Sequence, residues 1–295
     1  MGRKRTSMPP ARKVSYGRIS DMSRQSSRSA RVSRSIDGMQ ALGLNPRAYS
    51  LITGISMVRI EPPVAPANLY RYRSLTHRPN SLASEIRSIR EAYLYCSNFR
   101  TMNDPMEGFY DPTVGLRGVE DYEHVVRRIY DAKSYHGIAC FSETNSNELM
   151  WAHYADNYAG ICVRYKTQAL LDGLSNDVCV ARVNYGDVPP PVDHDDAMDS
   201  RSAAIKILSH KKAAWAYERE WRVLGNIKRT SYDDHHAVDA IYFGSRIDDE
   251  HRDRILDELA NMRIDFFNMT VRGYQHLFEP LDAHPPRRRR ADERA

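Results

Sequence analysis

The sequence has no long apolar run, and this absence excludes a membrane-spanning helix of ordinary length. Of the 295 residues, 41% are hydrophobic and the mean hydropathy is −0.62. No stretch approaches the length of about 20 apolar residues that such a helix needs. The hydrophobic fraction is nevertheless sufficient for the core of one large domain or two small ones.

Cysteine is scarce, and its spacing matches no metal-binding or disulfide pattern. The four cysteines, Cys96, Cys140, Cys162 and Cys179, form no Cys-x-x-Cys motif and no Cys/His cluster. This argues against a structural zinc site and against a disulfide scaffold. Cys140 and Cys162 lie in apolar segments, so we expect unreactive core thiols in a reducing compartment.

The positive charge is concentrated at the two ends of the chain. Residues 1–40 contain ten Lys and Arg, two acids and nine Ser, and residues 281–295 carry a charge of +2. The intervening residues, 41–280, carry −5. A nucleic-acid-binding core is therefore not indicated.

Both ends are predicted to be disordered, because they have too little apolar periodicity to bury a core. We expect a Ser/Arg-rich leader over residues 1–60 and a basic tail over residues 281–295. The leader is typical either of a targeting segment or of a solvated tail. Likewise, Arg287–Arg290 is either a polyanion-binding patch or a solvated cluster.

Between these ends, residues 61–280 are predicted to form a single α+β domain. Apolar periodicity predicts strands over 69–75, 93–96, 137–142, 160–165, 180–185 and 240–244. Helices are predicted over 81–92, 119–132, 147–157, 200–213 and 249–262. Short strands mixed irregularly with helices favour an α+β fold over a doubly wound α/β sheet.

The segment Glu218-Arg219-Glu220 has the most chemical content. In a strand, its two carboxylates share one face, about 7 Å apart along the chain. Paired carboxylates suit cleavage of a glycosidic bond through a positively charged transition state. In a helix, Glu218 and Arg222 would instead form an ordinary i,i+4 ion pair. The sequence leaves both interpretations open.

Other polar motifs have simpler explanations. His153 is either a general base or a boundary histidine, and Asn103-Asp104-Pro105 predicts a turn that could line a pocket. The clusters 193–196 and 233–236 are rich in Asp and His, but they lie in polar loop sequence, so no metal site is predicted.

Five blocks occur in a fixed order that resembles a known family. They are Leu69–Arg73, Asn103–Glu107, Cys140–Glu143, Met150–Ala155 followed by Gly160, and Tyr217–Arg222. Together they resemble the bacterial family catalogued as domain of unknown function family 2971, over about residues 69–246. That family has no settled activity, so this resemblance implies no chemistry.

The order of the polar residues is similar to that of ADP-ribosyltransferases with an Arg–Ser–Glu signature. Arg73 or Arg71 lies on the first strand, Ser142 ends a later strand, and Glu218-x-Glu220 comes late. The resemblance implies a mixed or antiparallel split sheet with flanking helices, and NAD as a substrate. The strand 137–142 followed by a helix carrying Trp151 and Tyr154 is also similar to the nicotinamide pocket of poly-ADP-ribosylating enzymes.

The same resemblance implies a role for each candidate residue. Glu220 would hold the nicotinamide ribose, and Glu218 would orient the acceptor. Arg73 or Arg71 would bind the pyrophosphate. The remaining candidates for the cofactor-binding pocket are Ser142, Asn103, and Trp151 or Tyr154, one of which would stack on the nicotinamide ring.

We therefore expect a transferase that moves ADP-ribose from NAD to an unknown protein or nucleic acid. Its expected setting is the bacterial cytoplasm, or a host cell reached through a type III-like leader, as a toxin, effector or phage-defence protein. Two alternatives remain. One is a hydrolase or nuclease that uses Glu220, His153 and Asp104, with or without a metal, and the other is a non-catalytic binding module.

Overall fold

The computed structural model describes residues 64–233 and 236–281. The chain divides into two units between Pro62 and Pro63, and all described residues belong to the second unit. The predicted disordered leader, and the basic tail after residue 281, lie outside the described residues.

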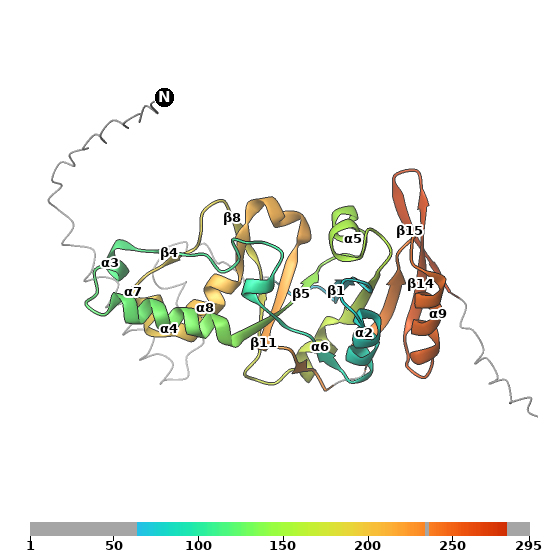
Figure 1. Ribbon diagram of the computed structural model, residues 1–295, viewed down its shortest axis with the longest axis horizontal. Helices are drawn as coiled ribbons and strands as arrows, with labels where there is room; N and C mark the ends of the chain where they lie inside the picture. Colours follow the sequence, from blue (N-terminus) through green and yellow to red (C-terminus); the bar gives the residue numbers. More distant parts are fainter. Residues whose placement is uncertain (1–63, 234–235, 282–295) are drawn as a thin grey trace, which may run out of the picture. The chain divides into compact units, whose positions relative to one another are not determined.

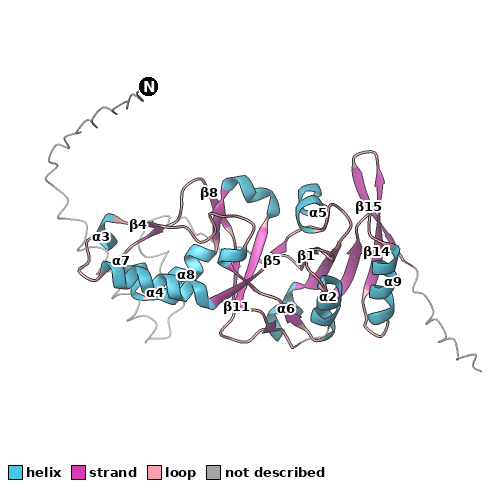
Figure 2. Ribbon diagram, viewed as in Figure 1, coloured by secondary structure: helices cyan, strands magenta, loops and turns pink. Residues whose placement is uncertain are grey.

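Strands and helices alternate irregularly along the described chain (Figures 1 and 2). The strands are β1 (Asn68–Arg73), β2 (Tyr93–Leu94), β3 (Ser97–Asn98), β4 (Asp111–Pro112), β5 (His136–Ser142), β6 (Ile161–Lys166), β7 (Cys179–Arg182), β8 (Asn184–Gly186), β9 (Pro191–Val192), β10 (His210–Lys212), β11 (Glu220–Asn226), β12 (Thr230–Ser231), β13 (Val238–Phe243), β14 (Asp265–Arg272) and β15 (Gln275–Pro280). The helices are α2 (Ser81–Arg90), α3 (Val114–Arg117), α4 (Tyr122–Tyr135), α5 (Glu148–Tyr154), α6 (Thr167–Gly173), α7 (His194–Met198), α8 (Ser200–Leu208) and α9 (Asp249–Glu258), with short 3₁₀ helices η2 (Phe99–Thr101) and η3 (Ala213–Glu218).

One mixed sheet organises the described residues. Its strands follow the order β15-β14-β13-β6-β1-β5-β11-β7, and β3 pairs with β5. The neighbours are antiparallel except β13 and β14, which are parallel and are joined through α9. A parallel pair requires such a crossover connection, whereas the antiparallel hairpin β14–β15 needs only a short turn at Gly273.

The sheet splits between β1 and β5. β1 pairs with β6 along its whole length, from Asn68↔Lys166 to Arg73↔Ile161. In contrast, β1 pairs with β5 only at Tyr70↔Ser142. Away from that point β1 and β5 are not paired with each other, although β1 stays paired with β6 and β5 with β11. This separation creates the space for the cavity described below.

Helices cover the two faces of the sheet at β1 and β6. Leu82, Ile86 and Ile89 recur at helical spacing on α2 and are buried in one core cluster with Leu69 and Val163 of the sheet. Residues of α5, in particular Trp151, pack instead with Tyr72 and Cys162 in a second cluster. Because successive residues of a strand point to opposite faces, α2 and α5 lie on opposite sides of this part of the sheet.

A separate helical layer packs beside β9. Helices α3, α4, α7 and α8, at the left of Figure 1, enclose a third apolar cluster. Its fully buried members include Leu116 of α3, Ile129 of α4 and Ile207 of α8. Asp193 caps α7 in a capping box with Asp196, so this acidic cluster has a structural explanation.

The α+β class and most predicted elements are confirmed, but several details of the prediction are wrong. The predicted strand 180–185 is two strands, β7 and β8, and the predicted helix 200–213 ends at Leu208, where β10 follows. The hairpin β14–β15 was not predicted from the sequence. No helix in the described part of the chain is long and apolar enough to cross a membrane.

Candidate functional site

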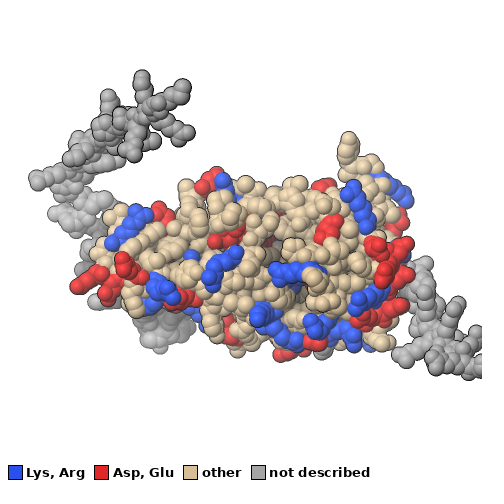
Figure 3. Space-filling model, viewed as in Figure 1, with Lys and Arg blue, Asp and Glu red and all other residues tan. Residues whose placement is uncertain are grey.

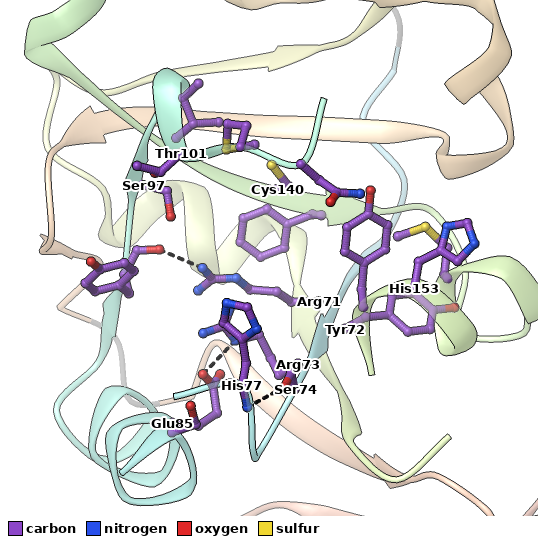
Figure 4. A pocket seen from close by; sticks show the side chains of 18 of the residues that line it. Arg71, Tyr72, Arg73, Ser74, His77, Glu85, Ser97, Thr101, Cys140 and His153 are labelled. Atoms are coloured by element: carbon purple, nitrogen blue, oxygen red, sulfur yellow. Dashed lines mark hydrogen bonds and ion pairs between the residues drawn. The ribbon is translucent and has the colours of Figure 1, made fainter. Parts of the chain in front are cut away.

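A cavity of about 650 Å³ lies where β1 and β5 separate (Figure 4). β1 and the facing part of β5 contribute its inner walls, and α2, the loop around Asp104, α5 and η3 complete it. Seven of the eight predicted site residues line this cavity: Arg71, Arg73, Asn103, Ser142, Tyr154, Glu218 and Glu220. The split of the sheet therefore brings together side chains that are far apart in the sequence.

Arg71 carries a buried positive charge into the cavity. It is 5% exposed, its Nη2 donates to the carbonyl oxygen of Tyr95 at 2.6 Å, and its guanidinium lies 5.9 Å from the ring centre of Phe141. Among the described residues, no carboxylate lies within ion-pairing distance of it. A buried charge is costly unless it is paired, so Arg71 offers an unused cation to an anionic ligand.

Arg73, in contrast, is already paired. Its Nε donates to Oε2 of Glu85 on α2 at 2.7 Å, and the side chain of Glu85 is only 4% exposed. Figure 4 shows this pair beside Arg71, joined by a dashed line. Of the two arginines that the sequence left as alternatives for the pyrophosphate, the geometry favours Arg71.

Glu218 and Glu220 face the same cavity, but not as one strand. Glu218 ends the 3₁₀ helix η3, Arg219 has a left-handed backbone with φ 46°, and β11 starts at Glu220. The strand interpretation of all three residues is therefore wrong, and so is the helix alternative for Arg222. The turn at Arg219 still places both carboxylates against Lys211, whose Nζ lies 2.6 Å from Glu218 Oε2 and 3.4 Å from Glu220 Oε2.

Both carboxylate oxygens of Glu220 form ion pairs. Its Oε1 accepts from Arg222 Nε at 2.8 Å, and its Oε2 accepts from Arg222 Nη2 and from Lys211. Burial alone would raise the pKa of Glu220, but the charges of Arg222 and Lys211 outweigh burial and lower it to about 2. Two cations thus hold Glu220 in its ionised form, so of the two glutamates it is the weaker proton acceptor.

Glu218 differs from Glu220 in having one cationic partner instead of two. Its Oε1 accepts from the hydroxyl of Tyr154 at 2.6 Å and its Oε2 from Lys211. Burial raises the pKa of Glu218, and the attraction of Lys211 offsets only part of this rise, which the charge of Glu220 reinforces. A carboxyl group with a raised pKa is suited to proton transfer near neutral pH.

The two glutamates belong to a buried charge array that sequence reasoning missed. Arg222 is fully buried and also pairs with Glu107, at 2.6 and 2.9 Å, so the array contains Glu107, Glu218, Glu220, Lys211 and Arg222. Three carboxylates face two cations, so one negative charge has no cation of its own. The raised pKa identifies Glu218 as the member that takes up a proton most readily.

A signal for two of these residues is present in the sequence. Arg222 lies on an apolar strand between Trp221 and Val223, and a buried arginine needs a carboxylate partner. Glu107 lies in one of the five sequence blocks described above, next to the predicted turn. Lys211 gave no such signal, because it lies among polar residues at the end of the predicted helix 200–213.

Three polar side chains position Glu218 directly or through a neighbour: Ser142, Tyr154 and Asn103. Ser142 is fully buried, and its Oγ donates to the backbone carbonyl of Glu218 at 2.8 Å. Tyr154 contacts Glu218 directly, and the side chain of Asn103 hydrogen-bonds to Tyr154. These residues position Glu218 at the cavity surface.

Trp151 does not line the cavity, so its predicted role as a stacking platform is wrong. It is fully buried, its Nε1 donates to the carbonyl of Asn145 at 2.6 Å, and its ring packs edge-on against Tyr72. This is the core position that its helical spacing also suggested. Of the two aromatic candidates, only Tyr154 reaches the cavity.

Neither a nucleophilic cysteine nor a metal cluster is apparent at this site. Cys140 lines the cavity, but burial raises its pKa well above the ordinary value and keeps the thiol protonated. Across residues 64–233 and 236–281, no group of three or more His, Cys, Asp or Glu could hold a metal ion. His153 lines the cavity and lies 3.2 Å from the hydroxyl of Tyr217.

The surface view shows a hollow near the middle of the displayed face, bordered by basic and acidic side chains (Figure 3). The arginines that line the cavity come from β1, the following loop and α2, namely Arg71, Arg73, Arg78 and Arg87, and Lys211 lines it from β10. The acids Glu218 and Glu220 come from η3 and the start of β11. The cavity therefore has a basic wall and an acidic wall.

These features define an α+β protein with a charged cavity at a split in its sheet. Residues 150–223, from α5 into β11, match the family model described as "Protein of unknown function (DUF2971)". The match supports the family that the sequence blocks suggested, and its span includes Tyr154, Lys211, Glu218 and Arg222. No curated protein and no solved structure matches the chain significantly.

Proposed function

We propose that the protein binds NAD in this cavity and transfers its ADP-ribose group to a macromolecular acceptor. The observation that carries the proposal is the placement of two groups on the walls of one cavity. One is Arg71, a buried cation without a carboxylate partner among the described residues, and the other is Glu218, a carboxyl group of raised pKa. A pyrophosphate bound at Arg71 gains a charge-assisted hydrogen bond from a buried guanidinium. The glycosidic bond to nicotinamide would then lie toward Glu218.

The charge array suits the reaction. The C1′–N bond of the nicotinamide ribose breaks, its electron pair leaves with the nicotinamide nitrogen, and positive charge develops on the ribose. When Glu218 is ionised, the array carries one uncompensated negative charge, which would stabilise this positive charge. The nucleophile of the acceptor then forms a bond to C1′, and its proton passes to the Glu218 carboxylate.

The roles proposed for the two glutamates differ from those that the resemblance to ADP-ribosyltransferases implies. Glu218, instead of Glu220, is the residue in reach of the reacting atoms, and Glu220 keeps Lys211 and Arg222 in place. Tyr154 orients Glu218 and presents its ring to the nicotinamide. The bacterial setting, the type III-like delivery and the identity of the acceptor stay predictions from the sequence.

The test is the release of nicotinamide from NAD by the purified full chain. We expect turnover in the wild type and a loss of about 10²–10⁴-fold in Glu218→Gln, with NAD binding retained, because only the proton acceptor is removed. Glu91→Gln is the matched control, since Glu91 is an exposed glutamate paired with Arg229 outside the cavity. Equal turnover of Glu218→Gln and the wild type would contradict the role of Glu218.

The products distinguish transfer from hydrolysis. With NAD labelled in the adenosine moiety, transfer places the label on a macromolecule, whereas a hydrolase releases free ADP-ribose. Binding of NAD without nicotinamide release would instead indicate a non-catalytic module. Absence of NAD binding by the folded protein would overturn the proposal altogether.

A further inference from the structure

Glu85 holds an unsatisfied oxygen at the cavity. It lies on α2, it is 3% exposed, and its Oε2 accepts from Arg73. Its Oε1 is buried and accepts no hydrogen bond from the described residues. A buried carboxylate oxygen without a donor is costly, so this position favours a ligand that supplies a hydrogen-bond donor.

The other buried glutamates of the cavity differ from Glu85 in this respect. Both oxygens of Glu107 accept from Arg222, and both oxygens of Glu220 accept from Arg222 or Lys211. Glu218 likewise has a donor at each oxygen. Glu85 is therefore the glutamate on the cavity wall whose hydrogen bonding a ligand would complete.

The order of residues along β1 runs from the level of Glu218 to Arg71 and then to Arg73, the ion-pair partner of Glu85. Tyr70 pairs with Ser142, which holds Glu218, so this level marks the reacting end. Arg71 follows one residue along β1, and Arg73, with Glu85, two residues after it. Residues two apart on a strand are separated by about 7 Å.

A dinucleotide fits this order. With its glycosidic bond at Glu218 and its pyrophosphate at Arg71, its adenosine ribose comes to lie beside Arg73 and Glu85. The hydroxyls of that ribose supply the donor that Glu85 needs. A carboxylate that accepts from ribose hydroxyls is a common basis for selecting NAD.

We infer that Glu85 makes the cavity selective for NAD over NADP, an inference that rests on the proposed function. The 2′-phosphate of NADP would meet the buried carboxylate of Glu85, and burial strengthens the repulsion between like charges. Arg73 does not offset this repulsion, because Glu85 already neutralises it. Arg78 and Arg87 are exposed at the cavity rim, where water screens their charges.

The experiment compares equilibrium binding of NAD and NADP to the full chain by calorimetric titration. We expect the wild type to bind NAD at least about tenfold more tightly than NADP, equivalent to about 1.4 kcal/mol. In Glu85→Gln, the preference should fall severalfold, because the negative charge is lost and Arg73 becomes free to bind a phosphate. Glu91→Gln, on the same segment but outside the cavity, should keep the wild-type ratio.

Each outcome decides the inference. Equal affinity of the wild type for both nucleotides, tighter binding of NADP, or an unchanged ratio in Glu85→Gln would overturn it. If NAD is bound preferentially but no nicotinamide is released, the proposed transfer fails while the selectivity of Glu85 stands. If neither nucleotide binds, both proposals fall together.

Discussion

Arg222 and Glu107 form a fully buried bidentate ion pair although 115 residues separate them in the sequence. This ion pair holds the loop that carries Asn103 and Asp104 against β11, and the loop forms part of the cavity wall. Because Arg222 also holds Glu220, one guanidinium fixes two carboxylates at once. The arrangement of the acidic wall depends on this residue.

Replacing Arg222 should therefore be severe. In Arg222→Met, Glu107 and Glu220 lose their buried cation, and we expect the free energy of unfolding to fall by about 3–5 kcal/mol. Urea unfolding of the purified variant measures this change. Arg254→Met removes only an exposed ion pair with Glu258 and should cost less than about 1 kcal/mol. Similar losses in the two variants would refute the structural role of Arg222.

The pKa of Glu220 predicts a specific dependence of stability on acid. Its pKa is lowered from 4.5 to about 2 in the folded protein, so its ionised form stabilises the fold above pH 4.5. This contribution is lost as the pH falls from about 4.5 to about 2. Glu220→Gln should accordingly lose less stability than the wild type over this range, as followed by urea unfolding at each pH. Parallel curves for the two proteins would show that Glu220 is not held ionised.

Gly160 lies against the backbone at the end of β1. A Cβ atom there would stand 2.3 Å from the carbonyl oxygen of Arg73 and 2.9 Å from Cα of Ala155. Backbone atoms cannot move aside cheaply, so Gly160→Ala should destabilise the protein by about 1–3 kcal/mol or more. Gly115→Ala is the control: its nearest neighbour would be 4.0 Å away, and the substitution lies in α3. We expect that variant to be as stable as the wild type or slightly more stable in thermal unfolding. A fully stable Gly160→Ala protein would contradict the packing at β1.

Ser142 is the residue at which β5 pairs with β1, and its side chain also binds the backbone of Glu218. Ser142→Ala removes the hydrogen bond to the Glu218 carbonyl and should cost about 1 kcal/mol of stability. Since the backbone of Glu218 is then less firmly positioned, nicotinamide release should slow while the KM for NAD changes little. Ser202→Ala, which removes an exposed contact with Asp199, should leave both constants unchanged. A rise in KM with an unaltered kcat would instead assign Ser142 to substrate binding.

The sequence predicted the parts of the fold that depend on local periodicity. The apolar spacing of Leu82, Ile86 and Ile89 identified α2, and the apolar run 137–142 identified β5. The hairpin β14–β15 escaped prediction because its residues are mostly half-exposed and alternate poorly between apolar and polar. Its position is determined by pairing with β13, which is a tertiary effect.

The sequence predicted most of the residues that line the site, but not the role of each. Motif order brought Arg71, Ser142, Tyr154 and Glu218 together as candidates, and all four line the cavity. The assignment between Glu218 and Glu220 could not be made, because it depends on Arg222 and Lys211 as ion-pair partners. Such partners are chosen by tertiary packing, which the spacing of residues along the chain does not reveal.

The central claim is that Arg71, which pairs with no carboxylate of the described residues, supplies a buried cation for the pyrophosphate of NAD. Calorimetric titration of the full chain with NAD tests this claim most directly, using Arg71→Met beside Arg272→Met, which changes an exposed arginine on β14. We predict saturable binding by the wild type and by Arg272→Met, and an affinity at least about tenfold weaker in a folded Arg71→Met protein. No binding of NAD by the wild type, or equal affinity in Arg71→Met, would contradict it.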